Sequence, residues 1–156
     1  PMLSKAVKMI ESFQTYNKTQ TIDHYAVALE AMLNLIKSLN MKILYPVVQD
    51  LTSNIAKVRC ANVEIQKIGI EWGTYTVQFF TQFLCLVVNE KLEPQDAAHI
   101  AYSAILHRHH NFAQKLLFHG VFKMMPSKQA FCEDQQINLN SNVEQIFANF
   151  KLCSDQ

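Results

Sequence analysis

Residues 65–88 read IQKIGIEWGTYTVQFFTQFLCLVV, and this stretch decides the fold. Its apolar residues cover more than one face of a helix, and it is longer than an ordinary strand. A helix that is apolar nearly all round is normally buried among other helices. We therefore expect a central helix over 65–88, with the other elements packed around it.

The segments before this stretch also carry apolar residues at helical spacing. They predict helices over 3–13, 21–39 and 43–58. Thr21 is placed to cap the second helix and Asn40 to end it. Three amphipathic helices are therefore expected ahead of the central one.

The segments after it continue the pattern. Pro94 is a good first-turn residue, and the apolar spacing predicts one helix from there through Phe118. A polar linker is expected over 135–142 and a short last helix over 143–152. With no internal repeat and no long heptad pattern, the sequence predicts an all-α single domain over 1–156, built as two packed helical layers.

Composition excludes several other classes of protein. Of the 156 residues, 49% are hydrophobic and 17% charged, so the chain is too apolar to be disordered. It contains 3 Gly and 4 Pro, fewer turn residues than β-sandwiches, barrels or glycine-cradled nucleotide folds need. The formal net charge of +1 is too small to recruit nucleic acid, so no such partner is expected.

The cysteines and the apolar runs indicate the cellular compartment in which the protein is expected. Cys60, Cys85, Cys132 and Cys153 form no CxxC pair, so we expect reduced thiols rather than a zinc or redox site. The first residues lack the pattern of a signal peptide, and the apolar run over 79–88 is too short and too polar to span a bilayer. A cytoplasmic protein is expected.

The segment over 45–58 carries the most informative polar pattern. Asp50, Asn54 and Lys57 follow at i, i+4 and i+7, which places an acceptor, an amide and a cation along one helix face. An apolar stripe lies beside that face, as suits a ligand with a polar head and an apolar tail. A solvated face with one local side-chain contact is the alternative interpretation of the same spacing.

Aromatic and histidine residues supply two further candidates. Trp72 is either a core indole or a flat platform for the apolar face of a sugar ring. His107 and His110 share a helix face, but no Cys or carboxylate cluster stands at ligand-like spacing from them. Neither a nucleophile elbow nor a nucleotide loop is present. No metal, no cofactor and no enzymatic activity are expected.

Four of these features occur in an order that resembles the glycolipid transfer protein family. They are Asp-x-x-x-Asn-x-x-Lys at 50–57, Trp72, a His two residues before an aromatic at 110–112, and Pro-x-Lys-x-x-Phe at 126–131. The resemblance covers about residues 42–131. It implies the two-layer helical sandwich of that family and non-vesicular transfer of a glycosphingolipid between membranes, without catalysis.

The resemblance also implies a role for each polar residue. Asp50 would accept hydrogen bonds from the sphingolipid amide N–H and from a sugar hydroxyl. Asn54 and Lys57 would bind sugar hydroxyls, and Trp72 would stack under the first sugar ring. His110 would donate to the acyl-amide carbonyl, so the two sides of one amide would be recognised by an acid and an imidazole.

The rest of the lipid is expected in an apolar tunnel, and the protein is expected to touch membranes transiently. Phe112 falls where the family has an aromatic residue that dips into the bilayer interface. A monomer is favoured, cytoplasmic and only transiently peripheral to membranes. The residues expected to hold the lipid chains are Leu33, Ile36, Phe79, Phe80, Phe83, Leu84 and Val87.

Two other functions share this fold. A ceramide-1-phosphate-type (phosphosphingolipid) transfer protein would have Arg at the positions of Trp72 and Thr76, so the pattern favours a sugar headgroup. A sphingolipid sensor or adaptor would bind the same ligand without bulk transfer, and the sequence does not separate it from a transfer protein.

The interval from Lys57 to Trp72 is shorter than in the family. No Gly or Pro interrupts 51–66, and one straight helix would place Asn54 and Trp72 roughly 27 Å apart. Two explanations remain, a break near 60–64 or a disordered loop omitted from the chain there. We favour the omitted loop, which the Cα separation across this stretch tests.

Overall fold

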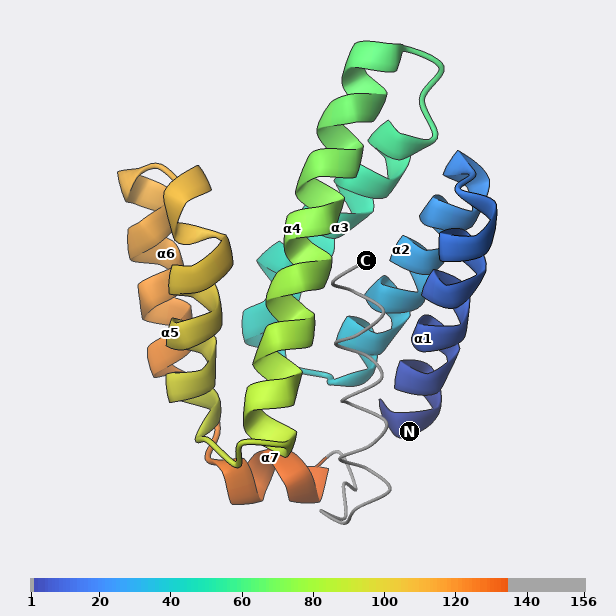
Figure 1. Ribbon diagram of the computed structural model, residues 1–156. Coiled ribbons are helices and arrows are strands. Elements are labelled where there is room, and N and C mark those ends of the chain that lie inside the picture. The colour runs from blue at the N-terminus through green and yellow to red at the C-terminus, as the bar shows by residue number, and fades with distance from the viewer. Residues whose placement is uncertain (1, 135–156) are drawn as a thin grey trace.

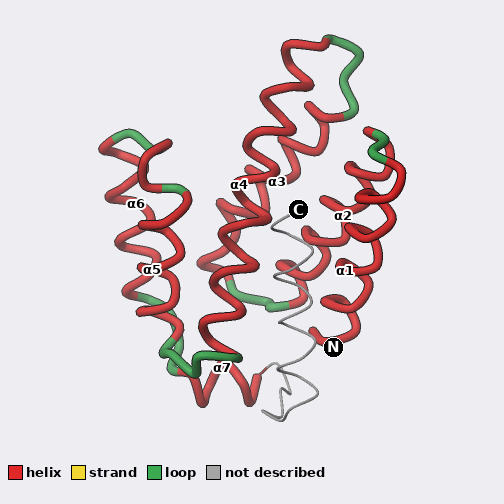
Figure 2. Tube along the Cα trace, in the orientation of Figure 1, coloured by secondary structure: helices red, strands yellow, loops and turns green. Residues whose placement is uncertain are grey.

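The structure is a computed structural model that describes residues 2–134, and within that range every regular element is helical (Figure 2). The all-α fold class is confirmed. The expected linker over 135–142, the last helix over 143–152 and Cys153 lie outside the described residues. The elements are α1 (Met2–Thr19), α2 (Ile22–Ser38), η1 (Lys42–Leu44), α3 (Tyr45–Val58), α4 (Val63–Val88), α5 (Pro94–Ile105), η2 (His107–His109), α6 (Phe112–Lys123) and α7 (Lys128–Asp134).

Successive helices pack against one another, and α4 lies in the middle (Figure 1). The pair α1–α2 flanks it on one side, the pair α5–α6 on the other, and α3 packs along it. The short α7 crosses the end at which α4 finishes. Residues from Val77 to Val88 supply much of the buried core, as the all-round apolar pattern of this segment predicts.

Close contact between α3 and α4 depends on a glycine. A Cβ on Gly69 of α4 would lie 2.7 Å from the carbonyl oxygen of Asn54 and 2.8 Å from Cβ of Lys57. The absence of a side chain at Gly69 therefore lets the backbones of the two helices approach, and it sets the polar face of α3 directly beside α4.

The chain reverses direction between α3 and α4 within residues 59–62. Backbone bonds from Arg59 to Ile55 and from Cys60 to Lys57, both 3.1 Å, close the last turn of α3. The side chain of Asn62 then caps α4, accepting from the N–H groups of Glu64 and Ile65. One straight helix is thus not formed. The break lies close to 60–64, as in the first of the two explanations, and the omitted loop that we favoured is not required for α3 and α4 to pack together.

The single helix expected from Pro94 through Phe118 is wrong. The helix ends at Ile105, and after a 3-10 turn His110 takes an extended conformation with φ −99 and ψ 142. Asn111 then caps α6 with a capping box, in which its side chain accepts from the Gln114 N–H and the Gln114 side-chain oxygen accepts from the Asn111 N–H. The Asn-x-x-Gln spacing is the sequence signal that could have predicted this break. Because of the break, His110 lies outside the helix.

The boundaries of α2 agree with the sequence. Thr21 caps the helix through a bond from His24 N, and Asn40 ends the turn that follows with a φ of 52. The third helix begins later than expected, because residues 42–44 form a 3-10 turn before α3.

Cysteine states and membrane-spanning potential follow from the described residues. Within residues 2–134, no disulfide joins Cys60, Cys85 and Cys132 to one another. Of the helices within 2–134, none has the length and apolar character needed to cross a bilayer.

Candidate functional site

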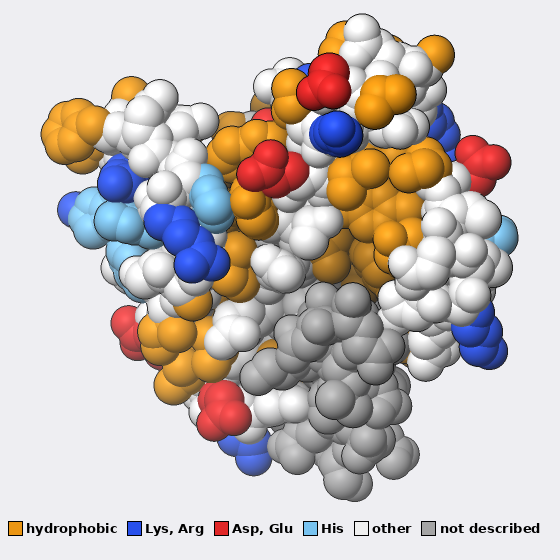
Figure 3. Space-filling model, turned by 45° about the horizontal axis from the view of Figure 1, so that its top comes forward, with side chains coloured by type: hydrophobic (Ala, Val, Ile, Leu, Met, Phe, Trp, Pro, Cys, Tyr) orange, Lys and Arg blue, Asp and Glu red, His pale blue; other side chains and the backbone are white. Residues whose placement is uncertain are grey.

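A cavity of about 280 Å³ opens between α3, α4 and the α5–α6 pair. Hydrophobic side chains line the furrow between the α5–α6 side of the molecule and the central helices (Figure 3). All five residues expected to bind the headgroup and amide reach this one cavity, from α3, α4 and the segment before α6. Its walls are formed by Pro46, Val47, Asp50, Asn54, Lys57, Ile68, Trp72, Thr76, Phe79, Phe80, Leu106, His110, Gln114, Leu117 and Phe118.

The polar wall comes from α3. Asn54 is buried, with 2% of its surface exposed, and its Nδ2 donates to Oδ2 of Asp50 at 3.2 Å. Partial burial raises the pKa of Asp50, and the nearby charge of Lys57 opposes that rise. An acceptor, an amide and a cation thus lie along one wall of the cavity, all three on α3.

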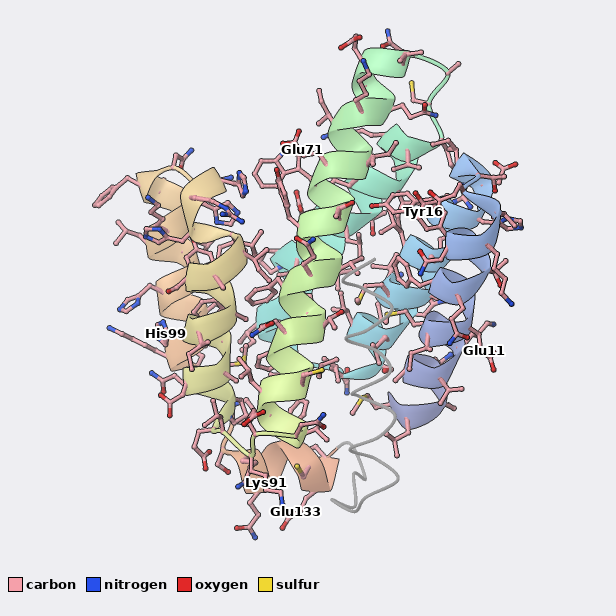
Figure 4. All side chains as sticks on the ribbon, viewed as in Figure 1. Glu11, Tyr16, Glu71, Lys91, His99 and Glu133 are labelled. Atoms are coloured by element: carbon pink, nitrogen blue, oxygen red, sulfur yellow. The ribbon has the colours of Figure 1, made fainter. Side chains whose placement is uncertain are left out.

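The aromatic wall is centred on Trp72 of α4. The ring of His110 lies nearly parallel to the indole, with centroids 6.0 Å apart and planes at 18°. Beside this pair, Tyr75 stacks on His109 at 4.0 Å, and its hydroxyl donates to Glu71 at 2.8 Å. Figure 4 shows Glu71 on the side of α4 that faces α5 and α6. Sequence reasoning missed His109, because the expected continuous helix hid the 3-10 turn that presents it.

His110 is held by Tyr102 of α5, whose hydroxyl lies 2.8 Å from Nδ1 of the imidazole. Burial lowers the pKa of His110, and the charges of His109, Lys115 and His107 lower it further. This lowered pKa favours the neutral imidazole. In the tautomer in which Tyr102 donates to Nδ1, Nε2 carries the proton and can donate to a bound group.

The apolar floor contains part of the predicted tunnel. Phe79 and Phe80 line the cavity. Leu33, Ile36, Phe83, Leu84 and Val87 are buried in the core and do not line it.

One face of α6 completes the cavity. Gln114, Leu117 and Phe118 stand at i, i+3 and i+4 on that helix, a spacing that could have identified them. Phe112, at the start of α6, is outside the cavity and 76% exposed. Among residues 2–134 no group of three His, Cys, Asp or Glu side chains is arranged to hold a metal ion.

Comparison with known proteins gives a match to a family model over part of the chain and a fold shared with solved structures. Residues 68–136 match the family model described as glycolipid transfer protein, a segment that includes Trp72 and His110 and begins after α3. No curated protein sequence matches the chain.

Solved structures resemble the whole described fold. A fungal glycolipid transfer protein, HET-C2, matches at a TM-score of 0.72 and 17% identity, over 86% of this chain and 79% of that one. FAPP2, described as selecting simple glycosphingolipids with this fold, matches at 0.71 and 17% over the same shares. A mutant of Arabidopsis ACD11 in complex with ceramide-1-phosphate matches at 0.78 and 9%, over 99% of this chain and 89% of that one. The resemblance found in the sequence is confirmed: the chain has the two-layer all-α fold of the glycolipid transfer proteins, and its residues 68–136 match that family.

Proposed function

We propose that this protein binds one glycosphingolipid at a time and carries it between membranes. The observation that carries the proposal is the convergence of Asp50, Asn54, Lys57, Trp72 and His110 on a single cavity floored by phenylalanines. Such transfer involves no chemical step. It needs headgroup binding that offsets extraction of the lipid from its bilayer.

The donors and acceptors of the cavity suit a sphingolipid amide with a sugar attached. The amide offers one N–H and one carbonyl, which the Asp50 carboxylate and the His110 Nε2–H can satisfy together. Asn54 and Lys57 supply donors for sugar hydroxyls. The indole of Trp72 offers its flat face to the ring.

The lipid chains require more space than the cavity has. Its volume of about 280 Å³ lies at the lower limit for a small-molecule site, which is about 300 Å³. Phe79 and Phe80 line it and pack against Phe83, which is buried outside it together with Leu84 and Val87. We infer that chain entry moves these two rings and opens the core between the helices, since a tightly packed interior has no preformed tunnel.

The start of α6 is the part of the protein that contacts the bilayer in this proposal. Phe112 is the most exposed large apolar side chain among the described residues, at 76%. An exposed apolar ring beside a lipid-binding cavity favours docking at the membrane interface.

A phosphosphingolipid is the second candidate ligand, because ACD11 is similar in fold and its structure holds ceramide-1-phosphate. Lys57 is a point charge that could meet a phosphate. Trp72 and Thr76, which line the cavity, offer no guanidinium for bidentate binding of phosphate oxygens. The lining therefore favours a sugar.

A vesicle-to-vesicle transfer assay tests the proposal. Donor vesicles carry labelled glucosylceramide or labelled ceramide-1-phosphate in phosphatidylcholine, and acceptor vesicles are phosphatidylcholine alone. We expect transfer of the glycolipid and much slower transfer of the phosphate. The reverse preference would assign the second ligand, and binding without transfer would indicate a sensor or adaptor.

Trp72→Ala should weaken binding of glucosylceramide about fivefold and binding of ceramide little, because loss of one ring contact costs about 1 kcal/mol. Trp72→Phe should restore part of the difference. Both affinities can be measured by competition with a labelled lipid.

Tyr16→Ala is the matched control for this substitution, since Tyr16 is a half-buried ring that packs on Tyr25, outside the cavity. An equal loss for glucosylceramide and ceramide would show that Trp72 is structural. In the unsubstituted protein, Trp72 is the single tryptophan, so its fluorescence should change on adding glucosylceramide.

A further inference from the structure

A second hollow lies on the other side of α6, in the groove between α5 and α6, with a volume of about 330 Å³. His99 and His119 face each other across it, with ring centroids 5.3 Å apart. Phe122 and Tyr102 form its buried floor. Its lining consists of His99, Tyr102, Ser103, His107, Lys115, Leu116, His119 and Phe122, and we refer to it as the histidine groove.

The lining of the histidine groove is rich in donors and lacks carboxylates. Three imidazoles, the hydroxyl of Ser103 and the ammonium of Lys115 can all donate hydrogen bonds, and no Asp or Glu is among its residues. Asp96, one turn before His99 on α5, does not line it. This donor set suits an anion. It does not suit a metal ion, which the ammonium would repel.

The surroundings of the groove are also cationic. His and Lys or Arg side chains gather on the α5–α6 side of the molecule, and His99 lies in that layer (Figures 3 and 4). The positive charges of Lys115 and His107 also act on His110, and they help to lower its pKa. Arg108 adds a guanidinium in the adjoining 3-10 turn.

The groove shares a helix face with the exposed aromatic ring of α6. Phe112, Lys115, Leu116 and His119 stand at i, i+3, i+4 and i+7, so they lie along one side of the helix. Phe112 and Leu116 are 76% and 57% exposed. Seating these apolar side chains in a bilayer interface would bring the groove to the level of lipid phosphates.

We propose that the histidine groove binds the phosphate of an anionic phospholipid while α6 is docked on the membrane. Lys115 supplies the charge, and Ser103 and the imidazoles supply N–H and O–H donors to the phosphate oxygens. The transferred lipid occupies the cavity on the opposite side of α6, so both ligands can be held at once. The proposal rests on the proposed function only in requiring that the protein visits a membrane.

Vesicle flotation without any glycolipid tests the groove. Vesicles of phosphatidylcholine alone are compared with vesicles that contain one fifth phosphatidic acid. We expect binding to rise with phosphatidic acid. Ser103→Leu, which fills the groove without changing the charge, should remove most of that rise, whereas Ala104→Leu on the neighbouring exposed position should not.

A charge variant provides the second arm. Lys115→Gln should weaken binding to the anionic vesicles about fivefold, the effect of one lysine near an anionic surface. Lys8→Gln removes an equal charge on α1 and should have little effect. Thermal unfolding checks that all four variants fold. Equal losses in Ser103→Leu and Ala104→Leu, or equal losses in the two lysine variants, would overturn the proposal.

The third arm separates lipid phosphate from free phosphate and from the transfer function. Inorganic phosphate is titrated while the side-chain NMR signals of His99, His107 and His119 are followed. Shifts caused by free phosphate, without any gain of vesicle binding from phosphatidic acid, would overturn the assignment to a lipid. Ser103→Leu should transfer glucosylceramide between neutral vesicles at the normal rate. If the unsubstituted protein does not transfer it yet binds anionic vesicles through the groove, the proposed function fails and the groove stands.

Discussion

Asp50→Val should reduce glucosylceramide binding by roughly 100-fold or more, and the protein should remain folded. The carboxylate is the acceptor that we assign to both the amide N–H and a sugar hydroxyl, and a hydrogen bond to a charged group contributes about 1.5–3 kcal/mol. The side chain is exposed at the cavity mouth, and its described bond is the one from Asn54. Competition binding and vesicle transfer measure the loss.

Thr52→Val is the matched control for Asp50→Val. Thr52 lies on the same helix, is exposed and does not line the cavity, and its hydroxyl bonds to the carbonyl of Val48. This variant should bind the glycolipid normally. Retention of binding by Asp50→Val, or a comparable loss in Thr52→Val, would count against the site.

The same carboxyl predicts how binding depends on pH. Although Asp50 is exposed overall, partial desolvation of its carboxyl raises the pKa of Asp50 above its ordinary value, so glycolipid binding should be lost as pH falls through that raised value. For an acid whose pKa is raised on folding, the folded chain holds the proton more strongly. Stability from this group is therefore present at low pH and falls as pH rises through the same window. Asp50→Asn should flatten this part of the binding profile and should not lower the free energy of unfolding at pH 7, as titrations and urea unfolding would measure.

The helical architecture could be predicted because apolar spacing is a local property. The buried segment up to Val88, the Thr21 cap and the stop at Asn40 follow from patterns within a few residues. The breaks between α3 and α4 and between α5 and α6 have weaker signals, since neither 59–62 nor 106–111 contains Gly or Pro. Both breaks depend on Asn caps, which are weaker signals than a loss of periodicity.

The polar half of the site could be predicted better than its apolar half. Asp50, Asn54 and Lys57 share a face because helical spacing dictates it, and the resemblance added Trp72 and His110. Which apolar residues border a hollow depends on how helices distant in sequence pack together. For that reason α6 contributes side chains to the cavity that the sequence did not identify, and Leu33 and Ile36 lie in the core instead.

Gly69→Ala should destabilise the fold and disturb the site together. The added Cβ would lie 2.7 Å from the Asn54 carbonyl and 2.8 Å from Val58 N, which are backbone atoms that a side-chain rotation cannot move. The helices α3 and α4 must separate, and overpacking of this kind costs about 1–3 kcal/mol. Urea unfolding should show the loss.

Gly120→Ala is the matched control, because a Cβ at Gly120 of α6 meets nothing within 4 Å. Alanine is the better helix former there, so this variant should gain about 0.5–1 kcal/mol. Asn54 and Lys57 of α3 line the same cavity as Trp72 of α4, so Gly69→Ala should lose glucosylceramide transfer at temperatures where it is still folded. Normal transfer by folded Gly69→Ala would mean that headgroup binding tolerates a displaced α3, and the converging geometry proposed for the cavity would then be wrong.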